Sequence, residues 1–192
     1  SYGTVTGVIR RSHHIACLAA LIKQVTDRGL VVMLASSDPA GSYIAPYGGK
    51  EPIFTPNPIA IGYPGTQQPV WIDVSTSITT VGMTKQKAAA GSQFEHPWLM
   101  DVNGCPTTDP HVIDPGVGGT LLPLGGLEYG HKGFGLSLMV EMLTHGLAGF
   151  GRPDAEKRWG AGVFLQVLDP AAFGGREDFL RQADYTIDRC HA

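Results

Sequence analysis

The chain opens with a strand–helix–strand pattern, which restricts its fold more than any other feature of the sequence. Thr4–Arg10 is rich in β-branched residues and predicts a strand. Ile15–Arg28 carries apolar residues at helical spacing, follows a candidate N-cap at Ser12 and stops at Gly29, so it predicts a helix. Leu30–Ala35 predicts a short buried strand. A unit of this kind indicates a helix-covered sheet with a right-handed crossover.

Strand-like and helix-like segments continue to alternate along the chain. Further strands are predicted at Ile59–Tyr63, Val70–Val74 and Ala161–Leu168, and further helices at Lys132–Leu147 and Glu177–Arg189. Ser75–Ala90 is ambiguous, because its threonines disfavour a helix that Lys85–Ala90 favours. The alternation predicts an α/β fold.

Two long segments between these elements lack periodicity. Ser37–Pro58 and Gly91–Gly126 hold many of the 26 glycines and 14 prolines, which together make up roughly a fifth of the 192 residues. A structureless loop of this length is uncommon in a compact domain and usually serves a function. We therefore expect both segments to make close contacts.

The composition excludes several classes of protein. The formal net charge is −3, so the chain offers no basic surface for nucleic acid. Although 43% of the residues are hydrophobic, no stretch approaches the roughly 20 continuous apolar residues of a membrane span. The three cysteines are far apart, and no signal-peptide pattern opens the sequence. We expect a cytoplasmic protein with neither a nucleic-acid nor a membrane partner.

Ser12, His13 and His14 lie between the first predicted strand and the helix after it. Ligands of α/β sheets bind where strand ends face helix starts, and free N–H groups there attract anions. An imidazole at that position can transfer a proton near neutral pH. The alternative is that Ser12 caps the helix and one histidine packs in the interior. The residues alone leave both interpretations open.

A glycine-rich run, Gly130–Gly135, opens the predicted helix Lys132–Leu147. Glycines let the backbone approach a ligand, and Lys132 adds charge where the helix dipole is already positive. This placement favours a bound anion such as phosphate. The run is neither a P-loop nor a Rossmann fingerprint.

Two further polar groups have simple structural explanations. Asp73, Val74 and Ser75 follow a predicted strand and could hold sugar hydroxyls or phosphate oxygens, although a turn with side-chain bonds is favoured on local grounds. Glu141 and His145 are four residues apart on the predicted helix and could pair with each other. Glu141 could instead meet a partner subunit, and a metal site would need a third ligand.

Seven motifs occur in order along nearly the whole chain. They are SHHIA at Ser12–Ala16, SDP…APYGGKEPIF at Ser37–Phe54, TPNPIAIGYP at Thr55–Pro64, IDVSTS at Ile72–Ser77, DVNGCPTTDP at Asp101–Pro110, LLPLGG at Leu121–Gly126 and GHKGFGLSLMVEML at Gly130–Leu143. The set resembles the malate/L-lactate dehydrogenase family that lacks a Rossmann fold, which includes malate, sulfolactate, ureidoglycolate, 2,3-diketogulonate and Δ1-piperideine-2-carboxylate enzymes. The adjacent His13 and His14 resemble the last branch most.

The resemblance implies a three-layer α/β/α fold with a mixed-direction sheet. This would be a non-Rossmann NAD(P)-binding domain of the L-sulfolactate dehydrogenase-like type over residues 1–192. It implies hydride transfer between NADH or NADPH, with NADP favoured, and a small 2-oxo acid or cyclic 2-imino acid. It also implies a homodimer with the active site near the subunit interface.

The resemblance also assigns residues. His14 matches the family histidine at the nicotinamide, which has a proton-transfer role, and is the expected catalytic residue. Asn57, in the TNP turn, is expected to be architectural. The expected cofactor-binding residues are His13, His14, Ser37, Asp73, Val74, Ser75, His131 and Lys132. No metal ligand is implied.

The sequence departs from the family pattern in places. Met83 stands near a position where the reductase branch has a carboxylate tied to the catalytic network. A helical segment with a further histidine before this domain, and a cofactor loop after it, lie outside the sequence. We therefore expect the chain to be the cofactor-binding part of a longer enzyme, without turnover alone. Candidates for recognising a ribose 2′-phosphate are Arg10, Arg11 and Lys50.

Two other classes of function stay open. One is a non-catalytic nucleotide-binding or subunit-interaction domain, which nucleotide-binding and turnover measurements would distinguish. The other is a metal-dependent hydrolase that would use His13, His14, Glu141 and His145. A metal analysis would test that alternative.

Overall fold

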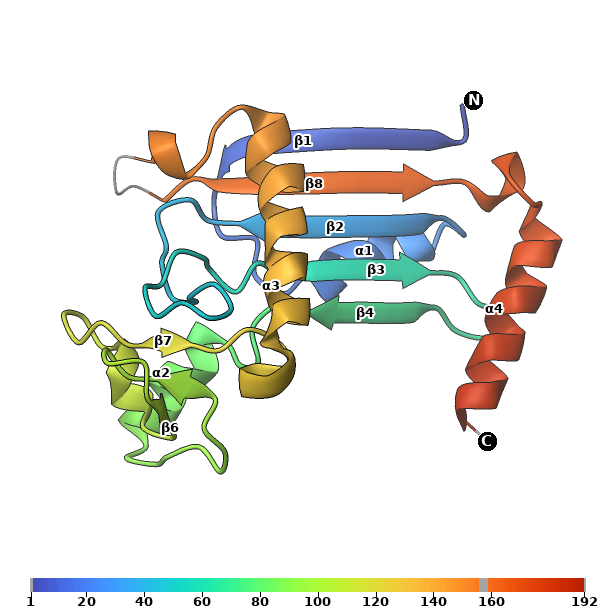
Figure 1. Ribbon diagram of the computed structural model, residues 1–192. Helices are drawn as coiled ribbons and strands as arrows, with labels where there is room; N and C mark the ends of the chain where they lie inside the picture. Colours follow the sequence, from blue (N-terminus) through green and yellow to red (C-terminus); the bar gives the residue numbers. More distant parts are fainter. Residues whose placement is uncertain (1, 156–158, 192) are drawn as a thin grey trace.

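The computed structural model describes residues 2–155 and 159–191 and is built around a five-stranded sheet. Its strand order is β1-β8-β2-β3-β4 (Figure 1). The strands are β1 (Thr4–Ser12), β2 (Val31–Ser37), β3 (Ile59–Tyr63), β4 (Val70–Val74) and β8 (Ala161–Leu168). The strands expected from the sequence are thus all found, with small shifts at their ends.

The predicted α/β class and its three layers are confirmed, but the mixed direction of the sheet is not found. Every neighbouring pair of strands in the described sheet is antiparallel. β1 and β2 do run parallel, as the opening strand–helix–strand unit predicts, but they are not neighbours. β8 arrives from far along the chain and pairs with both, so it separates them.

One helix covers each face of the sheet. In Figure 1, α3 (Gly126–Glu141) crosses in front of the strands and α1 (Leu18–Thr26) lies behind them. Leu18 and Ile22 of α1 are fully buried against β2 and β3, and Val140 of α3 packs on Phe164 of β8. A last helix, α4 (Arg176–His191), lies beyond the end of the sheet at which β3 and β8 finish (Figure 1).

α3 begins at Gly126 rather than at Lys132, so the prediction that Gly130–Gly135 opens this helix is wrong. Gly133 lies inside the helix, where a Cβ would come within 2.3 Å of the Leu124 nitrogen. The glycine therefore serves close packing of the helix on the preceding loop. Past Glu141 the helix widens into a π-helical turn, η2 (Met142–Gly146).

The predicted loop over residues 91–126 contains a small sheet of its own, made of β5 (Leu99–Met100), β6 (Pro106–Thr107) and β7 (Thr120–Leu121). The ambiguous segment resolves into α2 (Val81–Ala89), because Thr80 accepts a hydrogen bond from the Met83 N–H and caps it. Short 3₁₀ turns occur at η1 (Pro110–Ile113), η3 (Arg152–Asp154) and η4 (Pro170–Ala172).

Within the part of the chain that the structure describes, no helix is both long enough and apolar enough to cross a membrane.

Candidate functional site

A cleft of about 590 Å³ opens where α1 and α2 begin and where β2 and β4 end. This volume lies within the range of small-molecule pockets. Four of the residues expected at the site line it, namely His14, Ser37, Asp73 and Ser75. The cleft therefore gathers residues that are far apart in the sequence.

His14 is an exposed side chain that lines this cleft. Its Nδ1 accepts a hydrogen bond from the Ala16 N–H at 3.2 Å, and its ring packs against Trp159 with centroids 5.6 Å apart. Because Nδ1 is an acceptor, the proton of the neutral ring is on Nε2. The neutral ring therefore keeps its Nε2–H as a hydrogen-bond donor.

The structure contradicts one expectation for the neighbours of His14, the cap at Ser12. Ser12 is the last residue of β1, and α1 begins at Leu18, so Ser12 does not cap that helix. His13 is exposed and is not among the described residues that line the cleft. Its expected contact with a cofactor stays a prediction.

Asp73 supplies the cap that α1 lacks. The N-cap residue Cys17 makes no capping bond through its side chain. Asp73 Oδ2 instead accepts hydrogen bonds from the Ala19 N–H at 2.9 Å and from Cys17 Sγ at 3.5 Å. Because the first N–H groups of a helix have no partner within the helix, this contact stabilises the start of α1 beside the cleft.

Val74 and Ser75 follow Asp73 but face different surroundings. Val74 is exposed and does not line the cleft, since side chains alternate along β4. Ser75 lines the cleft, and its hydroxyl donates to the Ser77 carbonyl at 2.9 Å. The structure therefore brings only part of this segment to the cleft.

Ser37 has its side chain turned into the interior. It is 2% exposed, and its Oγ lies 2.8 Å from Glu141 Oε1 and 2.7 Å from Asn57 Oδ1. Asn57 is fully buried with a φ of 42°, in keeping with the architectural role expected for it. The Ser37 hydroxyl therefore belongs to a buried network behind the cleft.

Glu141 is the centre of that network. Arg152 donates to it twice, from Nη2 to Oε1 at 2.7 Å and from Nε to Oε2 at 3.0 Å. His145 Nδ1 lies 2.8 Å from Oε2, so the predicted pairing of these two residues is found. Burial raises the pKa of the Glu141 carboxyl, but hydrogen bonds from His145 and Arg152 outweigh it and lower that pKa to about 2.

His145 has an oxygen acceptor beside each ring nitrogen. Nδ1 faces the Glu141 carboxylate, and Nε2 lies 3.0 Å from the Ser37 carbonyl oxygen. Glu141 is consequently held between the His145 ring and the Arg152 guanidinium.

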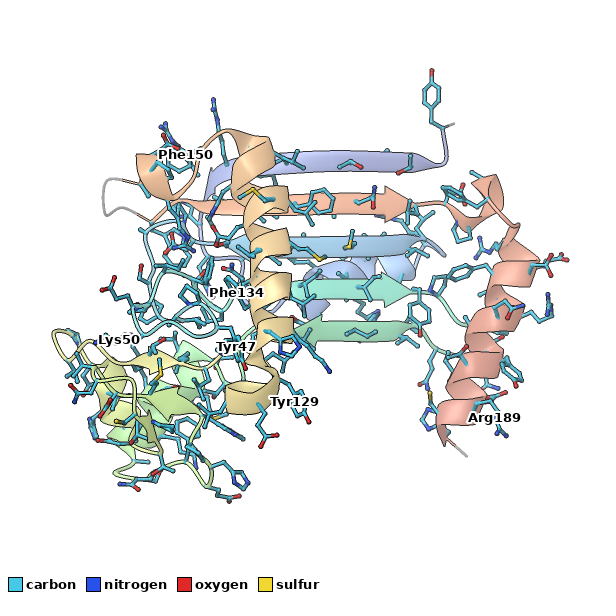
Figure 2. All side chains as sticks on the ribbon, in the orientation of Figure 1. Tyr47, Lys50, Tyr129, Phe134, Phe150 and Arg189 are labelled. Carbon is cyan, nitrogen blue, oxygen red and sulfur yellow. The ribbon has the colours of Figure 1, made fainter. Side chains whose placement is uncertain are left out.

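His131 and Lys132 lie on the first turns of α3 and are not among the described residues that line the His14 cleft. The His131 ring contacts Tyr47, and Lys132 Nζ lies 5.2 Å from the centre of the Tyr129 ring. Figure 2 shows Tyr47 and Tyr129 beside the start of α3. The structure therefore divides the expected cofactor residues into two groups.

The candidates for recognising a 2′-phosphate also lie outside the His14 cleft. The Arg11 guanidinium is 4.7 Å from the centre of the Phe150 ring, and Arg10 is exposed. Lys50 lines a second cavity of about 650 Å³, which Tyr47 and Leu127 also line. Lys85 is the lysine that lines the His14 cleft itself.

Several residues of this region were not expected from the sequence. Lys85, Asp38 and Trp159 line the cleft, and Arg152 joins Glu141 from beyond the π-helical turn. No periodic signal connects Arg152 to Glu141, because the two belong to different elements. Met83 is exposed on α2 and is not among the described residues of the cleft lining.

The residues of the metal-hydrolase alternative do not form one site. Glu141 and His145 bond to each other in the interior, whereas His13 and His14 are exposed beside α1. Among residues 2–155 and 159–191, no group of three or more His, Cys, Asp or Glu side chains could hold a metal ion.

Comparison with known proteins agrees with this fold. The family model described as malate/L-lactate dehydrogenase matches residues 1–192. A (2R)-3-sulfolactate dehydrogenase (NADP(+)) of Chromohalobacter salexigens is 37% identical over 89% of this chain and 51% of that protein. A Δ1-pyrroline-2-carboxylate/Δ1-piperideine-2-carboxylate reductase of Pseudomonas putida is 33% identical over the whole chain and 56% of that protein.

Solved structures give the same result. The Δ1-piperideine-2-carboxylate reductase of Pseudomonas syringae pvar. tomato superposes with a TM-score of 0.84 at 32% identity, over 98% of this chain and 57% of that one. The chain thus spans about half the length of the relatives it matches. The match of the family model along the whole sequence shows that the chain belongs to the malate/L-lactate dehydrogenase family.

Proposed function

We propose that the protein is an NAD(P)H-dependent oxidoreductase that interconverts a 2-oxo acid, or a cyclic 2-imino acid, with the corresponding 2-hydroxy or amino acid. The observation that carries this proposal is the His14 ring, exposed in a cleft with its Nε2 proton unused within the chain's described contacts. The names of the relatives, two of which reduce cyclic imino acids or oxidise sulfolactate, support the substrate class.

The residues of the cleft fit the nicotinamide end of such a cofactor. Trp159 and His14 offer aromatic faces, and Ser37 and Ser75 also line the cleft. When bound, the nicotinamide supplies or accepts the hydride. Trp159 and the wall of the cleft would orient the ring and exclude water from it.

His14 performs the proton transfer in this proposal. In the reductive direction, the protonated His14 ring donates a proton to the oxygen or nitrogen on the substrate C2 as the hydride arrives, which leaves the ring neutral. In the oxidative direction, the neutral ring takes that proton back. Groups of this kind contribute roughly 10²–10⁴-fold to the rate.

We further propose that residues 1–192 form the nucleotide-binding domain of a longer homodimeric enzyme, with NADP preferred. The preference rests on the relative named for NADP(+). The homodimer rests on apolar side chains that α3 and the turn after it leave uncovered: Leu138 is 44% exposed, Met139 50%, Met142 62% and Leu147 62%. Large apolar side chains left exposed along one helix and the turn after it are typical of an interaction surface.

The test is oxidation of NADPH and NADH by the full-length protein with a panel of substrates. The panel contains pyruvate, the 2-oxo acids that correspond to malate and sulfolactate, and a cyclic 2-imino acid. We expect turnover with at least one of them, and loss of that turnover in His14→Asn. The control is His191→Asn in α4, which should retain it. Binding of nucleotide without turnover on any substrate would favour the non-catalytic alternative.

A further inference from the structure

The wall of the His14 cleft is made by two separate segments of chain. Ser36, Ser37 and Asp38 come from the end of β2, and Thr55, Pro56 and Pro58 come from the segment before β3. Strand pairing holds part of this wall, because Ser36 and Ser37 pair with β8 and the Ser36 N–H donates to the Pro58 carbonyl at 3.1 Å. Asp38 and Thr55 lie beyond these strand pairings, so other contacts must position them.

The first segment is held from behind by three contacts to one buried cluster. The Ser37 hydroxyl lies 2.8 Å from Glu141 Oε1, and the Ser37 carbonyl accepts from His145 Nε2 at 3.0 Å. Farther on, the Gly41 carbonyl accepts from Arg152 Nη1 at 2.7 Å. All three contacts reach the wall from α3 or the turns after it.

The second segment is held by the same cluster through Asn57. Asn57 Nδ2 donates to Glu141 Oε1 at 2.8 Å, and Thr55 Oγ1 lies 2.7 Å from Asn57 Oδ1. Thr55 in turn accepts from the Asp38 N–H at 3.3 Å, which joins the two segments to each other. One carboxylate thus connects both halves of the wall.

We propose that Glu141 is a positioning residue for the cleft. Resting on the proposed nucleotide-binding function, the proposal is that Glu141 holds both wall segments in the arrangement that receives the nucleotide. Glu141 is 5% exposed and is not among the described residues that line the cleft, so it acts through Ser37, Asn57 and Arg152.

The geometry requires a carboxylate at this position. Oε1 accepts from Ser37, Asn57 and Arg152, while Oε2 accepts from His145 and Arg152. A glutamine has only one acceptor oxygen, so either orientation of its amide directs N–H groups at donors. The π-helical turn that carries His145 packs closely against Gly162, where a Cβ would lie 2.8 Å from the His145 Cδ2.

The test variant is Glu141→Gln in the full-length protein. The matched control is Val32→Ala, which removes a fully buried side chain on the same strand as Ser37 but at its other end. The two variants are compared at a temperature well below both melting points. Two quantities are measured: hydrogen exchange along the chain, and the Kd for NADPH from its fluorescence.

We expect Glu141→Gln to raise hydrogen exchange selectively in residues 36–44 and 53–58. We also expect it to raise the Kd for NADPH about tenfold, which corresponds to the contribution of one charged hydrogen bond. Val32→Ala should leave exchange in these two segments and the Kd for NADPH within twofold of wild type. If Glu141→Gln does not fold, Arg152→Lys is the second test variant. Its lysine keeps a positive charge but cannot make both contacts of the guanidinium to Glu141, so the same changes should appear more weakly.

The outcomes separate this proposal from the function beneath it. If Glu141→Gln and Val32→Ala change exchange alike, or if the wall keeps its protection and its affinity in Glu141→Gln, the positioning role is overturned. If the wild-type protein binds neither NADPH nor NADH, the proposed function fails. The exchange pattern then still decides whether Glu141 positions the wall.

Discussion

The open side of the cleft, at His14, and the buried network behind its wall, at Glu141, are built in opposite ways. On the open side, His14 is exposed and its ring makes one hydrogen bond to a backbone N–H. On the inner side, Glu141 is 5% exposed and accepts hydrogen bonds from four different side chains. The comparison suggests a division of roles, in which loosely held groups do chemistry and tightly held groups keep the wall in place.

The largest effect should come from removing the inner carboxylate. Glu141→Ala leaves Arg152 without its counter-charge, and breaking a buried ion pair from one side costs about 3–5 kcal/mol. Urea unfolding should show this loss, whereas Glu95→Ala at an exposed position should change stability by less than about 0.5 kcal/mol. A loss below about 1 kcal/mol for Glu141→Ala would break the comparison.

Replacing the histidine on the open side should lower activity and leave stability nearly unchanged. His14→Asn should lower kcat by roughly a hundredfold or more, because a general acid is removed. Its unfolding free energy should stay within about 0.5 kcal/mol of wild type, since the side chain is exposed. Steady-state kinetics and urea unfolding of the same preparation check both halves. Full activity in this variant would contradict the role given to His14.

Acid should weaken the contacts of the inner carboxylate, Glu141. The pKa of Glu141 is lowered from 4.5 to about 2 in the folded protein. A lowered folded-state pKa adds stability above the unfolded value, and this contribution is lost as the pH falls from about 4.5 toward 2. Unfolding curves across this range should fall more steeply for wild type than for Glu141→Gln. Parallel curves would show that this carboxylate is not the source.

A smaller effect is expected at Lys132, which belongs with His131 to the second group of expected cofactor residues. We expect Lys132→Ala to raise the KM for the cofactor about tenfold or more, because a charged hydrogen bond contributes about 1.5–3 kcal/mol. Kinetics on the full-length enzyme with NADPH measure it directly. An unchanged KM would mean that Lys132, which lies outside the His14 cleft, has no part in cofactor binding.

The smallest effect is expected at the edge of the cleft, where Asp73 caps α1. Asp73→Ala should cost about 1 kcal/mol of stability, the usual effect of losing a cap. Asp73→Asn retains an acceptor oxygen for the Ala19 N–H and should keep most of that stability. If the two variants are equally destabilised, the carboxylate charge matters more than the cap.

The fold could be predicted where local periodicity determines it. The strands from β2 to β4 and the helix α1 were found from their patterns, because burial on one face repeats with the period of the element. The place of β8 between β1 and β2 could not be found that way. Its pairing joins residues such as Val5 and Val167, and no local pattern records such a contact.

The residues of the site likewise differ in whether a local sequence signal reveals them. The adjacent His13 and His14 after a strand are conspicuous, but only the family resemblance singled out His14. Glu141 and His145 could be paired because their spacing fits one helix face. Arg152 was missed, since its contact to Glu141 depends on how the chain turns after α3. The start of α3 was misplaced because glycines that pack a helix closely look like glycines that open one.

The central claim is that His14 meets the nucleotide in this cleft. The most direct measurement is the NMR signal of the His14 Cε1 proton in the full-length protein, assigned by its absence in His14→Asn, during titration with NADPH. We predict that this signal shifts as the nucleotide saturates, while the signal of His191 in α4 does not move. Binding of NADPH with the His14 signal unchanged would contradict the account.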